Sequence, residues 1–287
     1  MSSARSGNER GESPEFACEV RNARGGCAGV SAERSRPEDD PGGISLVFTS
    51  EGEPVEARLY QPLQSTGRPG LVISPSRVTT VAEMSWLAKP LLERGYTVLV
   101  QGYRRGAVRY QLCDVADVGN AISWLQENVH HGRLRIGLIG HSRGGSASLR
   151  AAALDRRVES TVSLSAPIDV ARYMNGLREH SPSRYAMLAK GYGASPAEDP
   201  EYYRAISPLR YADRIRMPVL LIHGQDDMIA PKENSEWMYA ALAVSGNTRA
   251  RLELIAGAGH FFEHRFLAPR FEQIVHLIDR WFAETLR

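Results

Sequence analysis

Short apolar runs that alternate with helical patterns constrain the fold of this chain more than any other feature. Six runs are typical of strands buried on both faces: 71–73, 96–100, 136–139, 158–164, 219–222 and 252–255. Helical patterns occupy 81–94, 114–128, 143–154, 232–244 and the last stretch, where apolar residues from Phe271 to Phe282 recur three and four apart. This alternation predicts an α/β fold with a mostly parallel, doubly wound sheet and helices on both faces.

The first sixty residues follow a different pattern. Residues 44–48 and 55–60 alternate apolar and polar side chains around Glu51-Gly52-Glu53-Pro54, which predicts an antiparallel hairpin with one face in water. Residues 1–42 are rich in Ser, Gly, Arg, Glu and Pro, and they hold too few apolar side chains to offset the entropy of ordering. We therefore expect a disordered tail at 1–42 and a folded domain at 43–287.

One long segment interrupts the alternation. Residues 168–216 separate two predicted strands by far more than a usual loop, and they contain several tyrosines and arginines. Long insertions of this kind are mostly functional. We interpret 168–216 as a small helical cap over the site.

Composition excludes several classes of protein. The 287 residues include 35 basic and 33 acidic side chains, a net charge of +2, which argues against a nucleic-acid surface. No apolar run is long enough to span a membrane, and the first twenty residues have no signal-peptide core. Three cysteines (Cys18, Cys27 and Cys113) indicate free thiols in a cytoplasmic protein, with a Cys18–Cys27 disulfide as the alternative. No nearby histidine completes a metal site with them.

A motif for nucleophilic catalysis follows the third of the six apolar runs. Gly140-His141-Ser142-Arg143-Gly144 has the pattern G-x-S-x-G and is placed between a predicted strand and a predicted helix. That context places a serine hydroxyl at the carboxyl end of the sheet, with glycines where side chains would collide. The N–H of Arg143 at the helix start is a candidate oxyanion donor. The alternative is a glycine-rich turn without catalysis.

A serine needs a base and an acid, and this fold places them later in the chain. Asp226 and Asp227 follow the strand at 219–222, and both are candidates for the acid. His260 follows the strand at 252–255, in the loop 256–261, and we predict it to be the base. Its rivals are His223, His141, His264, His276, His130, His131 and His180.

These motifs resemble the α/β-hydrolase superfamily. Gly140–Gly145, the segment His223-Gly224-Gln225-Asp226-Asp227 and Gly257-Ala258-Gly259-His260 look closest to the catalytic domain of prolyl-oligopeptidase-like (S9-type) serine hydrolases and to dienelactone-hydrolase-like esterases. Tyr103-Arg104-Arg105-Gly106 and the Ser-Pro segment at 207–212 resemble further motifs of that group. The resemblance covers roughly 55–287. It implies an α/β-hydrolase fold, and in its H-G-x-x-D pattern the acid is Asp227.

The sequence departs from that family in two places. Where the family has His-Gly-Gly, this chain has Ser74-Pro75-Ser76-Arg77. Since Pro75 has no N–H, Ser76 becomes the candidate for the second oxyanion donor. Arg77 is either a contact for a substrate carboxylate or a solvated arginine. The family's oligopeptidases also carry a β-propeller, which about 42 tail residues cannot form, so we expect a different specificity.

Together these features predict a serine hydrolase that cleaves small carboxylic esters through a Ser142–His260–Asp227 triad. The first alternative is a peptidase or amidase that uses the same triad. The second is a catalytically weak binding protein with a hydrolase fold. The mechanism requires no metal ion or cofactor, and the sequence gives no indication of a nucleic-acid or membrane partner or of an oligomeric state.

Overall fold

Eight strands form one sheet in the part of the chain that the computed structural model describes, residues 43–64, 66–104, 111–129, 134–263 and 270–287. The strands are β1 (Ile44–Ser50), β2 (Glu53–Tyr60), β3 (Gly70–Ser74), β4 (Thr97–Gln101), β5 (Ile136–His141), β6 (Val158–Leu164), β7 (Val219–Gly224) and β8 (Ala250–Ile255). Their order in the sheet is β1-β2-β4-β3-β5-β6-β7-β8. All six strands from β3 to β8 run parallel, so the predicted mostly parallel sheet is confirmed.

The antiparallel hairpin at the start of the sheet is also present. Strands β1 and β2 pair from Ile44 with Leu59 to Ser50 with Glu53. The turn between them is shorter than the sequence indicated, because Glu53 and Pro54 already belong to β2. Glu51 and Gly52 have φ values of 48° and 86°, the left-handed conformation that tight hairpin turns require at both central positions.

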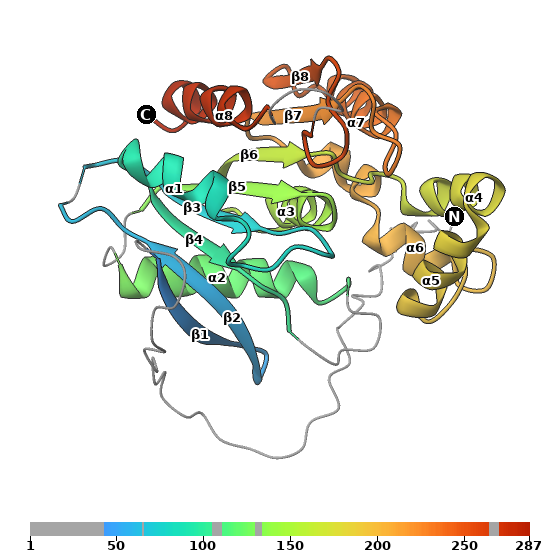
Figure 1. Cartoon of the computed structure of the whole chain (residues 1–287), viewed down its shortest axis with the longest axis horizontal. Coiled ribbons are helices and arrows are strands. Elements are labelled where there is room, and N and C mark those ends of the chain that lie inside the picture. The colour runs from blue at the N-terminus through green and yellow to red at the C-terminus, as the bar shows by residue number, and fades with distance from the viewer. Residues whose placement is uncertain (1–42, 65, 105–110, 130–133, 264–269) are drawn as a thin grey trace, which may run out of the picture.

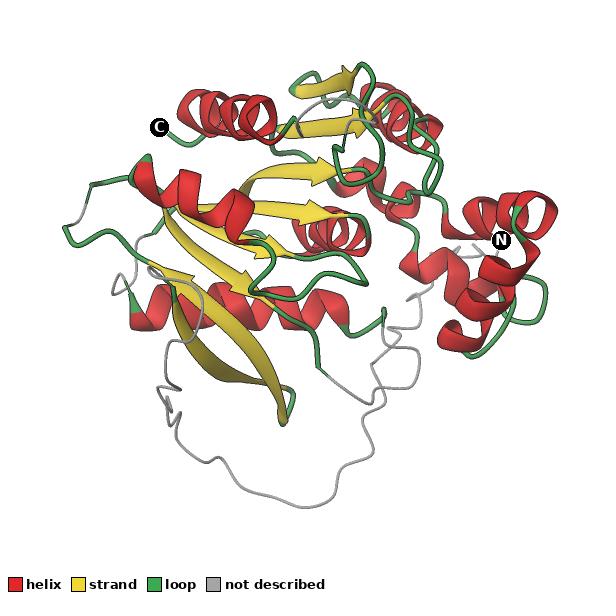
Figure 2. Cartoon of the chain, in the orientation of Figure 1, coloured by secondary structure: helices red, strands yellow, loops and turns green. Residues whose placement is uncertain are grey.

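Helices cover both faces of the sheet (Figure 2). Helices α1 (Ser85–Glu93) and α8 (Phe271–Thr285) pack on one face, and α2 (Asp114–Asn128), α3 (Arg143–Leu154) and α7 (Glu233–Val244) pack on the other. Alternation along β3 shows the two layers, because Leu71 and Ile73 join the core under α1 and α8 whereas Val72 joins the core under α2 and α3. Every residue of β3 is buried, as expected of a strand covered twice.

Helix α1 starts later than the pattern at 81–94 predicted. Thr80 and Glu83 bond each other reciprocally: the Thr80 backbone N–H donates to Glu83 Oε2 at 2.6 Å, and the Glu83 backbone N–H donates to Thr80 Oγ1 at 3.3 Å. These bonds have the reciprocal pattern of a capping box, but residues 81–84 form a turn, with the Ser85 N–H donating to the Ala82 carbonyl at 3.1 Å, and the regular helix begins only after it. The end agrees better, since Gly95 follows the helix with φ 87°.

The long segment between β6 and β7 is helical. It contains α4 (Val170–His180), α5 (Pro182–Tyr192), α6 (Pro200–Ile206) and the 3-10 helix η1 (Pro208–Arg214). Tyr192, Tyr202 and Tyr203 pack edge to face in a core that α4, α5 and α6 share. In Figure 1, α4, α5 and α6 lie beyond the carboxyl ends of β5, β6 and β7. That these helices act as a cap remains a prediction.

The expectation for the cysteines was wrong at Cys113, which is disulfide-bonded. Cys18 and Cys27 lie outside the described residues, as does the whole of the tail at 1–42. The sequence offered no signal for this bond, because nothing local relates Cys113 to another cysteine. In the described part of the chain, no helix has the length and apolar character needed to cross a bilayer.

Candidate functional site

The three predicted catalytic residues emerge at one edge of the sheet. Ser142 lies between β5 and α3, Asp227 follows β7 by three residues, and His260 follows β8 by five. Because β5, β6, β7 and β8 follow one another as parallel strands in the sheet, their carboxyl ends open on a common edge (Figure 1). This is where ligands bind to open α/β sheets.

Ser142 has an unusual backbone conformation, with φ 55° and ψ −114°. Residues other than glycine rarely adopt such a conformation, and surrounding contacts must hold it. A Cβ atom on Gly140 would lie 2.0 Å from the carbonyl oxygen of Gly144, and one on Gly144 would lie 2.0 Å from that of Ser74. The turn therefore requires both glycines of the motif, and it packs directly on the end of β3.

Asp227 and His260 form a buried hydrogen-bonded pair. His260 Nδ1 lies 2.7 Å from Asp227 Oδ2, and the two residues are 3% and 5% exposed. A carboxylate only accepts, so Nδ1 carries the proton and Nε2 keeps its lone pair. This is the tautomer that a general base needs. Asp226 is exposed, whereas Asp227 points inward.

The Asp227 carboxylate has four partners. Oδ1 accepts hydrogen bonds from the backbone N–H groups of Ile229 and Ala230, each at 2.8 Å, and Oδ2 also lies 3.1 Å from His223 Nε2. Burial alone would raise the pKa of Asp227, but the hydrogen bonds from His223 and His260 outweigh it and hold this pKa well below its usual range. Asp227 is therefore a permanent anion beside His260.

His141 connects the serine turn to the histidine loop. Its Nε2 donates to the backbone carbonyl of His260 at 2.8 Å, and the two rings are 5.1 Å apart. Burial, with a smaller effect of the nearby His260 ring, lowers the pKa of His141 to about 3. His141 is thus a neutral donor. Its hydrogen bond joins the residue that precedes Ser142 to the backbone of His260. The sequence placed His141 in the turn but gave no sign of this contact.

A pH-dependent stability follows from the buried His141. The unfolded chain protonates this histidine near pH 6.5, whereas the folded chain does so only near pH 3. Acid therefore favours unfolding between these values, by up to about 1.4 kcal/mol for each pH unit. We expect the unfolding free energy of the wild type to fall between pH 7 and pH 5 by about 2 kcal/mol more than that of His141→Gln, which keeps a donor. Urea unfolding at the two pH values measures the difference.

The matched control for this measurement is His276→Gln, because His276 is exposed on α8. Its pH dependence should match that of the wild type. If the unfolding free energies of His141→Gln and the wild type changed equally between pH 7 and pH 5, His141 would be protonated alike in the folded and unfolded chains.

The two predicted oxyanion donors come from adjacent segments. Arg143 is the first residue of α3, and Ser76 follows the end of β3 by two residues. The Gly144 position packs against both Ser74 and Pro75, which brings the start of α3 against the Ser76 loop. Among the described residues, no hydrogen bond is donated by the Ser76 N–H, while the Ser76 hydroxyl is bonded to Thr79. Ser76 is 3% exposed, and its role as the second oxyanion donor stays a prediction.

The rival histidines are placed elsewhere or have other roles. His180 and His276 are exposed on α4 and α8, and His130, His131 and His264 lie outside the described residues. His223 Nε2 also lies 2.7 Å from the carbonyl oxygen of Ala230, so it acts as a donor that supports the acid loop. Arg77 is half-buried in the loop after Ser76.

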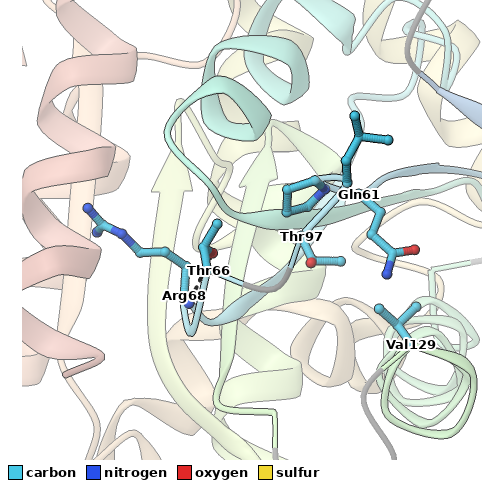
Figure 3. A pocket seen from close by; sticks show the side chains of 7 residues that line it. Gln61, Thr66, Arg68, Thr97 and Val129 are labelled. Carbon is cyan, nitrogen blue, oxygen red and sulfur yellow. Dashed lines mark hydrogen bonds between the residues drawn. The ribbon is translucent and has the colours of Figure 1, made fainter.

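Figure 3 shows a pocket that none of these residues lines. Its lining consists of Gln61, Pro62, Leu63, Thr66, Arg68, Thr97 and Val129. Thr97 is the first residue of β4, so this pocket is at the amino end of the parallel strands, opposite to Ser142.

The chain is similar to several known proteins. Residues 83–285 match the model of the prolyl oligopeptidase family. The chain is 25% identical to the uncharacterized peptidase YtmA of Bacillus subtilis over 64% of this chain and 72% of that protein. It is 26% identical to the acylamino-acid-releasing enzyme of Sus scrofa over 71% of this chain, but this match spans only 30% of that enzyme.

A solved structure shows the fold. An esterase from Pyrococcus furiosus superposes with a TM-score of 0.68 at 19% identity, covering 91% of this chain and 100% of the esterase. The predicted α/β-hydrolase fold is thereby confirmed.

Proposed function

Because this chain belongs to the prolyl oligopeptidase family and is a serine hydrolase, we propose that it cleaves carboxylic esters through an acyl-enzyme on Ser142. The observation that carries the proposal is the 2.7 Å bond between His260 Nδ1 and Asp227 Oδ2. This bond leaves His260 Nε2 as a base at the edge of the sheet where Ser142 emerges. No step of the mechanism calls for a metal ion or an organic cofactor.

The reaction runs in two halves. His260 Nε2 takes the hydroxyl proton as Ser142 Oγ bonds to the ester carbonyl carbon, and the carbonyl oxygen becomes an anion. The N–H groups of Arg143 and Ser76 bind that anion. The bond to the alcohol oxygen then breaks, and His260 gives its proton to the leaving alcohol. Water repeats the sequence on the acyl-enzyme and releases the carboxylic acid and Ser142.

Two observations support esters as the substrates. The match to the Pyrococcus furiosus esterase spans that whole protein, whereas the match to the acylamino-acid-releasing enzyme spans 30% of it. The loop after β3 also places Pro75 beside Ser76, so that Ser76 has the only N–H which these two residues can offer to the oxyanion. Amides have a poorer leaving group than esters and depend more on complete transition-state stabilisation. Peptide amides are the second candidate, favoured by the peptidase relatives.

Matched substrates separate the two candidates. We expect p-nitrophenyl acetate and butyrate to be hydrolysed with kcat/KM at least about 100-fold above that of p-nitroanilides with N-acylated alanine or phenylalanine as the acyl group. Both leaving groups are chromogenic, so one absorbance assay measures every substrate. Ser142→Ala serves as the blank for each.

Each contrary outcome has a definite meaning. Anilide hydrolysis equal to or faster than ester hydrolysis would make the protein a peptidase with the same triad. A wild type that hydrolyses neither substrate and resists a fluorophosphonate probe at Ser142 would be a binding protein with a hydrolase fold.

A further inference from the structure

The peptide bond between Pro75 and Ser76 determines where the second oxyanion donor points. A trans peptide is planar, so the Ser76 N–H points opposite to the Pro75 carbonyl. Whatever holds the Pro75 oxygen therefore sets the direction of the Ser76 N–H. Proline cannot contribute an N–H of its own to hold the loop, and the oxygen is the only hydrogen-bonding group on the Pro75 backbone.

Tyr103 holds this oxygen. Its hydroxyl donates to the Pro75 carbonyl at 2.7 Å. Tyr103 follows β4 by two residues, and β4 is the parallel neighbour of β3, which ends at Ser74. The bond thus joins the ends of adjacent strands beside the serine turn. Burial raises the pKa of the Tyr103 phenol despite the opposing effect of nearby Arg143, so the hydroxyl keeps its proton at every working pH.

The same ring supports the other donor. The Arg143 guanidinium lies over the Tyr103 ring, with its central carbon 3.8 Å from the ring centre. Arg143 Nε and Nη2 also donate hydrogen bonds to the two carboxylate oxygens of Asp114, at 2.9 and 2.6 Å. Stacking and a two-point carboxylate contact immobilise the arginine side chain at the start of α3. Tyr103 therefore contacts Arg143 directly and reaches Ser76 through the carbonyl of the Pro75–Ser76 peptide.

We propose that Tyr103 is a positioning residue of the oxyanion hole, which aims the Ser76 N–H through the Pro75 carbonyl and braces the Arg143 side chain. This inference rests on the proposed function, in which the Ser76 and Arg143 N–H groups bind the oxyanion. Tyr103 itself does not touch the substrate. Its hydrogen bond also polarises the Pro75–Ser76 peptide, which makes the Ser76 N–H a stronger donor.

The substitution Tyr103→Phe tests the hydroxyl alone, because phenylalanine keeps the stacking on Arg143. We expect kcat for p-nitrophenyl butyrate to fall about 10- to 100-fold, somewhat less than the loss of a whole donor, with KM changed less than about twofold. The inhibition constant of an alkylboronic acid should rise by the factor that kcat loses, because its tetrahedral adduct places an oxygen in the same hole. A merely structural role would not link these two quantities.

Tyr96→Phe is the matched control. Tyr96 directly precedes β4, at the end opposite to Tyr103, and its buried hydroxyl donates to Asp279 at 3.0 Å. This variant should lose some thermal stability and retain the kcat and boronate affinity of the wild type. Activity loss of equal size in both variants would overturn the proposal.

A second variant keeps the test decisive. Ser76→Pro removes the N–H itself, so adding Tyr103→Phe to it should cost little more than Ser76→Pro alone. If the two substitutions lowered kcat independently, so that their losses multiplied in the double variant, Tyr103 would not act through the Ser76 N–H. The fluorophosphonate labelling rate at Ser142 is measured in parallel, since it uses the same hole. If the wild type is labelled but cleaves no ester, the ester proposal fails, and the labelling rate of Tyr103→Phe still decides the role of Tyr103.

Discussion

Replacing Ser142 with alanine is expected to lower kcat for p-nitrophenyl butyrate by at least about 10⁴-fold. The variant loses the atom that would bond to the acyl carbon, and water must then attack directly without a covalent intermediate. The alanine also has to occupy the strained backbone position with φ 55°. Since serine and alanine share that strain, the fold should persist, and circular dichroism and Tm will report it. KM should change little.

The stronger form of this prediction concerns His260. His260→Ala should lose about as much kcat as Ser142→Ala, and the double variant should lose no more than either one, because a nucleophile and its base act as one unit. Ser148→Ala is the control, since Ser148 lies in α3 with an Oγ that has no hydrogen-bond partner among the described residues. Multiplicative losses in the double variant would mean that Ser142 and His260 do not act in the same step.

The sequence predicted the central strands well, because β3 to β7 are buried on both faces, whereas the predicted burial of both faces was wrong for β8, a partly exposed edge strand. Strands buried on both faces appear as unbroken apolar runs, and the run at 158–164 coincides with β6 to the residue. Helices α2 and α3 also have the predicted bounds. The start of α1 was predicted too early because residues 81–84 form a turn, and periodicity does not distinguish such a turn from the first turn of a helix.

Only those residues of the candidate site that belong to local sequence motifs could be predicted. The residue types and their order pointed to Ser142 and His260, but Asp226 and Asp227 could be distinguished only by resemblance. In the structure, Asp227 is buried with four hydrogen-bond donors, whereas Asp226 is exposed. Contacts between residues far apart in the chain escaped prediction altogether. His141 meets His260 across 119 positions, and Tyr103 meets Pro75 across 28, with no pattern to connect either pair.

Asp227→Asn is expected to lower kcat by about 10⁴-fold at pH 7, although it changes a single atom. The amide oxygen will stay where Oδ1 is now, because it accepts two backbone N–H bonds there, from Ile229 and Ala230. The amide N–H₂ then faces His260 Nδ1, which must become the acceptor. The imidazole proton moves to Nε2, and Nε2 can no longer take the proton of Ser142. Turning the amide over would restore the tautomer and the contact with His223, but it would set the amide N–H₂ against the N–H groups of Ile229 and Ala230 and lose both of their hydrogen bonds.

The neighbouring acid provides the control for this variant. Asp226→Asn removes the same charge from an exposed side chain one residue away, and it should keep kcat within about twofold of the wild type. Both variants are assayed with p-nitrophenyl butyrate, and the fluorophosphonate labelling rate at Ser142 should fall with kcat in Asp227→Asn only. Equal losses in the two variants would mean that net charge near His260, and not the tautomer that Asp227 fixes, governs the reaction. A loss in Asp226→Asn alone would transfer the role of the acid to Asp226, against the burial and hydrogen bonds of Asp227.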